Sequence, residues 1–117
     1  MAATVLIVDD HAGFRLSARR LLESDGFRVV GEAAGAREAV EAAGRLRPEI
    51  VLLDVYLPDG SGFDVATDLA RLPHPPAVVL TSSHDPEDFG DSLPAGDTRG
   101  FVAKGELCGS TVAALVA

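Results

Sequence analysis

The stretch TVLIVDD, residues 4–10, joins five β-branched or apolar residues to a pair of aspartates. A continuous run of this kind is typical of a strand buried on both faces of a sheet. Apolar residues then recur between residues 14 and 22 at the spacing of one helix face. The pair Asp25-Gly26 predicts the end of that helix. The chain therefore begins with a strand, an acidic turn and an amphipathic helix.

The same unit repeats along the rest of the chain. Further strands are expected at residues 27–33, 50–53, 77–80 and 100–103, and further helices at 36–46, 63–72, 85–93 and 111–116. Such alternation predicts an α/β fold in which a doubly wound five-stranded parallel sheet is covered by helices on both faces. The length of 117 residues fits one domain, residues 1–117.

Charge and composition narrow the classes of function. The formal net charge is −8, so direct binding of nucleic acid or of an anionic membrane is not expected. Arg15, Arg19 and Arg20 are predicted to form a solvated helix face. No apolar run approaches the roughly 20 residues that span a bilayer, and the single cysteine, Cys108, allows no internal disulfide. A cytoplasmic protein is expected.

Polar residues follow four of the predicted strands. Asp9 and Asp10 come after the first strand, Asp54 after the third, Thr81 after the fourth and Lys104 after the fifth. In an open parallel sheet, ligands bind beyond the carboxyl ends of the strands, so these side chains are expected to converge.

Three clustered carboxylates repel one another unless a cation offsets their charge. A hard divalent ion with oxygen ligands does so, and this predicts a Mg²⁺ site. Helix capping would explain one of these aspartates but not three.

The predicted cluster suits phosphoryl transfer. A carboxylate such as Asp54 can attack phosphorus and form an acyl phosphate. Phosphoryl transfer depends mainly on positioning and on neutralising charge. The Lys104 ammonium and Mg²⁺ would neutralise phosphoryl oxygens, and the Thr81 hydroxyl could donate a hydrogen bond to another.

The chain resembles CheY-like receiver domains of two-component response regulators over residues 4–116. The resemblance rests on the acidic pair, on Asp54 within LLDVYLPDG, on Thr81 and on Lys104. The VDDH start and the non-proline after the lysine look most like receivers of helix-turn-helix, NarL-like regulators. The resemblance implies a flavodoxin-like strand order of 2-1-3-4-5.

The resemblance also implies roles for individual residues. Asp10, Asp54 and the backbone carbonyl of Tyr56 would bind Mg²⁺ directly, and Asp9 would act through water. Asp54 would be the phosphoacceptor, and the donor would be a sensor histidine kinase or a phosphotransfer protein.

The resemblance assigns switching and timing to four residues. Thr81 and Phe101 would be switch residues, although Phe101 could equally be a plain core aromatic. Tyr56 and Ser83 would tune the rates of phosphorylation and hydrolysis. Such a domain is a signalling phosphoacceptor rather than an enzyme, and the family allows a homodimer.

Several features depart from the pattern of close relatives. Lys104 lies 23 residues after Thr81, and counting back from the lysine would favour Ser82 as the switch hydroxyl. The register of a buried strand is hard to shift, so we expect Thr81. Gly90 and Pro94 predict a short or interrupted fourth helix. Gly105 replaces a proline common in receivers, and all these changes fall on the surface used for output or dimerisation.

Three alternatives compete with a phospho-accepting receiver. A haloacid dehalogenase-like phosphatase would need an aspartate where Tyr56 stands. A flavodoxin-like or dinucleotide-binding domain would need a glycine-rich or hydroxyl-rich loop after the first strand. A degenerate receiver would act only as a binding module, and retention of all five site residues speaks against it.

Overall fold

A five-stranded parallel sheet forms the centre of the computed structural model, which describes residues 3–82 and 98–116. The strand order is β2-β1-β3-β6-β7. The strands are β1 (Thr4–Val8), β2 (Arg28–Ala33), β3 (Ile50–Asp54), β6 (Ala77–Ser82) and β7 (Gly100–Ala103). With β6 and β7 taken as the fourth and fifth strands, this is the predicted order 2-1-3-4-5, so the predicted fold is confirmed.

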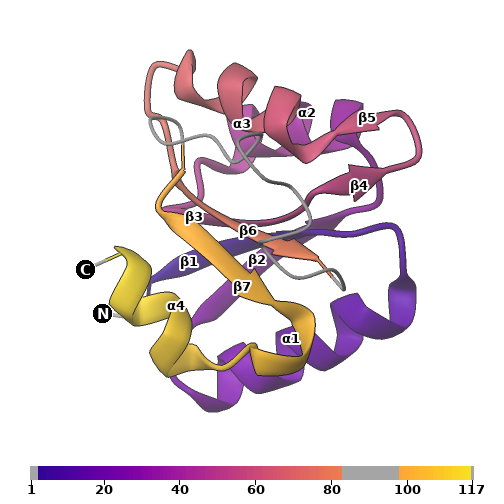
Figure 1. Ribbon diagram of the computed structural model, residues 1–117. Coiled ribbons are helices and arrows are strands. Elements are labelled where there is room, and N and C mark those ends of the chain that lie inside the picture. The colour runs from indigo at the N-terminus through magenta and orange to yellow at the C-terminus, as the bar shows by residue number, and fades with distance from the viewer. Residues whose placement is uncertain (1–2, 83–97, 117) are drawn as a thin grey trace.

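Helices cover both faces of the sheet (Figure 1). The helices are α1 (Ala12–Ser24), α2 (Ala36–Leu46), α3 (Gly62–Ala70) and α4 (Gly109–Val116), with a 3-10 turn at Lys104–Glu106. In Figure 1, α2 and α3 lie above the sheet and α1 and α4 below it. The continuous apolar strands follow from this arrangement, because both faces of each strand are buried.

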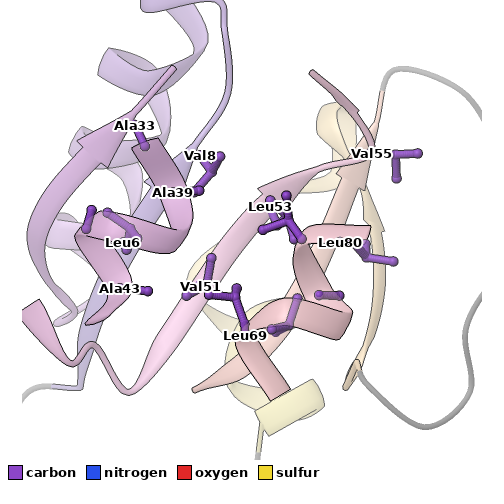
Figure 2. Packing of buried hydrophobic residues seen from close by; sticks show 14 residues of the cluster. Leu6, Val8, Ala33, Ala39, Ala43, Val51, Leu53, Val55, Leu69 and Leu80 are labelled. Atoms are coloured by element: carbon purple, nitrogen blue, oxygen red, sulfur yellow. The ribbon is translucent and has the colours of Figure 1, made fainter. Parts of the chain in front are cut away.

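Alternate residues of each strand feed two separate cores. Leu6 and Val8 pack toward α2 and α3, in the cluster shown in Figure 2, whereas Val5 and Ile7 pack toward α1 and α4. Burying a leucine-sized side chain contributes about 1.5–3 kcal/mol, so a shift of one residue in any strand would be costly. The polar residues at the strand ends therefore have a fixed direction.

The segment after β3 differs from the prediction. No strand was predicted between residues 54 and 62, but Tyr56–Leu57 (β4) and Gly60–Ser61 (β5) pair as a small antiparallel hairpin around Pro58 and Asp59. The next helix begins at Gly62 and ends at Ala70, two residues before the predicted end. Leu72 still packs against the core, which explains why its apolar pattern extended the predicted helix.

The predicted fourth helix, residues 85–93, lies outside the residues that the structure describes, as do Gly90 within it and Pro94 just after it. Among the residues that it does describe, no helix combines the length and the apolar character that crossing a membrane requires.

Candidate functional site

Strand register brings three of the predicted site residues to one face of the sheet. Asp9, Asp54 and Thr81 each come two positions after a core residue that packs toward α1 and α4, namely Ile7, Leu52 and Val79. Side chains two apart in a strand point the same way. Thr81 is also the register partner of Asp54, whereas Ser82 alternates to the opposite face. All three residues are buried.

Lys104 ties the carboxylates of two strands together. Its Nζ lies 2.6 Å from Oδ2 of Asp9 and 3.3 Å from Oδ2 of Asp54. The same ammonium lies 4.6 Å from the centre of the Phe14 ring on α1, which adds a cation–π contact. Asp9 after β1, Asp54 at the end of β3 and Lys104 after β7 thus meet at the carboxyl edge of the sheet, as predicted. Phe14 of α1 was not predicted to join them.

Burial and charge shift the proton affinities at this edge. Burial raises the pKa of Asp54, the Asp9 carboxylate raises it further, and Lys104 offsets only part of the effect. Burial alone would lower the pKa of Lys104, but the carboxylates of Asp9 and Asp54 outweigh it and raise that pKa above its usual value. The site therefore favours additional positive charge.

Asp10 and His11 form the solvent side of the cluster. Nδ1 of His11 lies 3.1 Å from Oδ1 of Asp9 and 3.1 Å from Oδ1 of Asp10. One ligand atom from each of Asp9, Asp10, His11 and Asp54 falls within 4.8 Å of all the others. Three carboxylates at this spacing are the donor set that a hard cation such as Mg²⁺ prefers, so the residues present fit the ion.

The Thr81 hydroxyl is buried beside this cluster. Its oxygen has no hydrogen-bond partner among residues 3–82 and 98–116. An unsatisfied buried hydroxyl costs about 1–3 kcal/mol, so its retention fits a hydroxyl kept for another partner. Phe101, on β7, is half-buried and packs against the core on the α2 and α3 side. Ser83 lies outside the described residues.

The arginines of α1 are not simply a solvated face, which corrects the prediction for two of them. The Arg15 guanidinium donates to Glu32 at 3.0 Å and to the backbone carbonyl of Asp9 at 2.7 Å. Arg19 pairs with the other carboxylate oxygen of Glu32, while Arg20 is exposed. This network could not be predicted from the sequence, because Glu32 on β2 is distant from α1 along the chain. Arg15 restrains the acidic loop that carries Asp9.

Gly62 is a site-supporting residue whose role the sequence did not reveal. Its amide donates to the Val55 carbonyl at 2.7 Å, and a Cβ at Gly62 would overlap the Asp54 carbonyl oxygen. The first turn of α3 therefore packs directly on the backbone that carries Asp54. Only the glycine-rich character of the GSGF stretch could have suggested such a close approach.

Asp59 fixes the β4–β5 hairpin to the start of α2. Its carboxylate accepts hydrogen bonds from the backbone N–H of Ala36 at 2.6 Å and of Arg37 at 3.2 Å. These two hydrogen bonds lower the pKa of Asp59. The carboxylate thus supplies the cap that Gly35, the N-cap residue, cannot provide.

Replacing Asp59 with alanine is expected to lower the melting temperature at neutral pH. Because the folded-state pKa is lowered, the stabilisation is present above the ordinary aspartate range and is lost as the pH falls through the folded-state pKa. Thermal unfolding from neutral to acidic pH should therefore show the curves of wild type and Asp59→Ala converging in acid. The exposed Asp68→Ala serves as control. A difference that persists undiminished in acid would contradict the capping role.

Comparisons with known proteins show the family of the chain and agree with its fold. The family model described as "Response regulator receiver domain" matches residues 5–110. The chemotaxis protein CheY of Thermotoga maritima is 31% identical over 105 residues, which are 89% of this chain and 87% of that protein. The DNA-binding transcriptional activator DevR/DosR of Mycobacterium tuberculosis is 39% identical over 102 residues, covering 86% of this chain and 46% of that protein.

Solved structures of receiver domains have the same fold as this chain. A two-component response regulator of the LuxR family from Aurantimonas superposes with a TM-score of 0.84 at 30% identity, covering 98% of this chain and 86% of that one. The chain spans about half or less of the length of several curated relatives that it matches, DevR/DosR among them.

Proposed function

Because the chain belongs to the response regulator receiver domain family, we propose that Asp54 accepts a phosphoryl group in a Mg²⁺-dependent reaction. The observation that carries the proposal is the Lys104 ammonium held between the buried carboxylates of Asp9 and Asp54. Receiver domains are signalling domains rather than classical enzymes, so membership disfavours the phosphatase and dinucleotide-binding alternatives.

In the proposed step, a carboxylate oxygen of Asp54 attacks phosphorus while the bond between phosphorus and the donor nitrogen breaks. The electron pair of that bond stays on the imidazole of the donor histidine, which takes up a proton. Bound Mg²⁺ would supply charge neutralisation for the phosphoryl oxygens. Asp10, Asp54 and the Tyr56 carbonyl are the proposed direct ligands, with Asp9 acting through water.

Residues of the chain would handle the rest of the phosphoryl charge. Lys104 already lies 3.3 Å from Asp54, so its ammonium is placed to pair with an oxygen of the product. The unpartnered Thr81 hydroxyl would donate to another oxygen. Movement of Thr81 toward the phosphoryl group, coupled to an inward movement of Phe101, is the proposed switch. Tyr56, 56% exposed beside the site, is a candidate for rate tuning, as is Ser83.

Receiver domains generally interact with histidine kinases or phosphotransfer proteins, and we propose such a donor here. Several relatives are transcriptional regulators by name, so control of an output domain or partner is part of the proposal, as is homodimerisation. The domain itself is proposed not to bind nucleic acid, in line with its net charge of −8. A cytoplasmic location remains an expectation.

Phosphorylation can be tested by intact mass spectrometry after incubation with Mg²⁺ and a small phosphodonor such as acetyl phosphate. Wild type is expected to gain one phosphoryl group, and both Asp54→Ala and a sample with a chelator should gain none. Lys104→Ala should accumulate far less adduct. A wild type without adduct would favour a degenerate receiver, and multiple turnovers releasing phosphate would favour a phosphatase.

A further inference from the structure

We propose that His11 is an additional ligand of the acidic cluster, and that the site therefore binds a first-row transition-metal ion such as Ni²⁺ more tightly than Mg²⁺. This inference rests on the proposed function, which places a divalent cation among the same carboxylates. It adds the class of metal that the site selects.

The spacing of the His11 imidazole fits a shared coordination sphere. Two ligands bonded at right angles to an ion about 2.1 Å away lie about 3 Å apart, and two opposed ligands lie about 4.2 Å apart. His11 Nδ1 lies 3.1 Å from one oxygen of Asp9 and 3.1 Å from one of Asp10. The largest separation among the four ligand atoms, including that of Asp54, stays within 4.8 Å. Asp10, His11 and Asp54 could therefore bond to one ion after small side-chain movements, with Asp9 acting through water as in the proposed function.

Hydrogen bonds hold the backbone of His11 in place beside the cluster. The His11 amide donates to Oδ1 of Asp9 at 2.8 Å, and the His11 carbonyl accepts from the Arg15 amide in the first turn of α1. The Arg15 guanidinium fixes the loop one step earlier, at the Asp9 carbonyl. His11 is thus anchored on both sides, while its ring is 70% exposed and free to exchange ligands with solvent.

The cluster carries more negative than positive charge, and its buried side shows this most clearly. Asp9 is fully buried, and its Oδ2 lies 2.6 Å from the Lys104 ammonium, which also lies 3.3 Å from Oδ2 of Asp54. A single ammonium shared with Asp54 leaves the cluster of three carboxylates short of positive charge.

Ligand chemistry decides which ion benefits from His11. Mg²⁺ prefers oxygen ligands and keeps several of its waters, so an imidazole adds little to its binding. Imidazole suits Ni²⁺, Cu²⁺ and Zn²⁺, and Ni²⁺ stands high in the general affinity order of divalent ions. A carboxylate site that includes one imidazole is therefore expected to bind Ni²⁺ more tightly than Mg²⁺.

Calorimetric titration of the whole chain with Ni²⁺ and with Mg²⁺ tests the proposal. His11→Ala is expected to weaken Ni²⁺ binding about tenfold or more and to change Mg²⁺ binding less than about twofold. Asp10→Asn should weaken both ions, because both use that carboxylate. His74→Ala, which removes an exposed histidine in the turn after α3, should change neither.

The outcomes that would contradict the role of His11 differ from the outcome that would contradict the proposed function. An unchanged Ni²⁺ affinity in His11→Ala, or an equal loss in His74→Ala, would overturn the role of His11 even if Mg²⁺ still supports phosphorylation of Asp54. Loss of both Mg²⁺ and Ni²⁺ affinity in His11→Ala would make the histidine a general support of the loop and would also overturn the selectivity. Absence of Mg²⁺ binding in wild type would instead contradict the proposed function.

Discussion

Replacing Gly62 with alanine is expected to lower the free energy of unfolding by about 3 kcal/mol, near the upper end of the usual cost of overpacking. The added Cβ would overlap the Asp54 carbonyl oxygen and would lie 2.8 Å from the Cα of Val55. Both neighbours are backbone atoms of a buried segment, so neither can swing aside as a side chain would. For a domain of this size the melting temperature should fall by on the order of 10 °C.

A second glycine provides a matched control. Gly44 lies inside α2, where an added Cβ would meet nothing within 4 Å. Alanine is favoured over glycine in a helix by about 1 kcal/mol, so Gly44→Ala should raise the melting temperature. Thermal unfolding of both variants compares the same chemical change in two environments. Equal effects of the two substitutions would contradict the close approach at Gly62.

Gly62→Ala should also slow phosphorylation at temperatures where the variant is folded. The clash acts on the carbonyl of Asp54 itself, so relief requires movement of the proposed phosphoacceptor. Intact mass after a short incubation with acetyl phosphate measures this effect, and the folded fraction at that temperature provides the normalisation. An unchanged rate per folded molecule would mean that α3 moved and β3 did not.

The sheet could be predicted from the sequence because its strands carry their own signal. Runs such as residues 4–8 and 50–53 are apolar on both faces, and the residue types alone distinguish them from solvated segments. The site followed from the same signal, since parallel strands share a carboxyl edge and polar residues at strand ends must meet there. Asp9, Asp54 and Lys104 meet as expected.

Contacts that depend on how the elements pack in three dimensions were not predicted from the sequence. Arg15 and Arg19 reach Glu32 across the gap between α1 and β2, and nothing local in either segment marks the partner. In the sequence, Asp59 stands between Pro58 and Gly60, where a turn residue is typical. Its role as a hydrogen-bond acceptor could not be predicted, because that requires knowing that α2 begins beside it. Such pairings depend on distances between elements, which periodicity does not encode.

Removing the Lys104 ammonium is expected to have the other large effect on the metal-free protein. Breaking a buried ion pair by deleting one partner typically costs 3–5 kcal/mol. The cluster opens to solvent at Asp10 and His11, so we expect about 2–3 kcal/mol for Lys104→Met. Arg20→Met, which removes an exposed cation of α1, should change the stability little. Chemical denaturation in the presence of a chelator measures both.

The pH dependence of the stability lost in Lys104→Met tests whether the buried carboxylates cause that loss. The folded-state pKa of Asp54 is already raised by burial and by Asp9, and loss of Lys104 removes the group that lowers it. A carboxyl with a raised folded-state pKa destabilises the protein increasingly as the pH rises from its unfolded-state pKa to its folded-state pKa. The deficit of Lys104→Met should therefore be full at neutral pH and shrink toward acid.

Adding Asp54→Asn to Lys104→Met should restore part of the lost stability, because it removes one of the two buried charges that the lysine neutralised. Asp54→Asn alone should raise the melting temperature in chelator and reduce the stabilisation by Mg²⁺, which acts only through binding to the folded state. The non-additivity of the two substitutions measures their coupling. Strictly additive effects would mean that Lys104 does not stabilise the fold through the charge of Asp54, and its ion pair with Asp9 and its contact with Phe14 would be left as the source of that stabilisation.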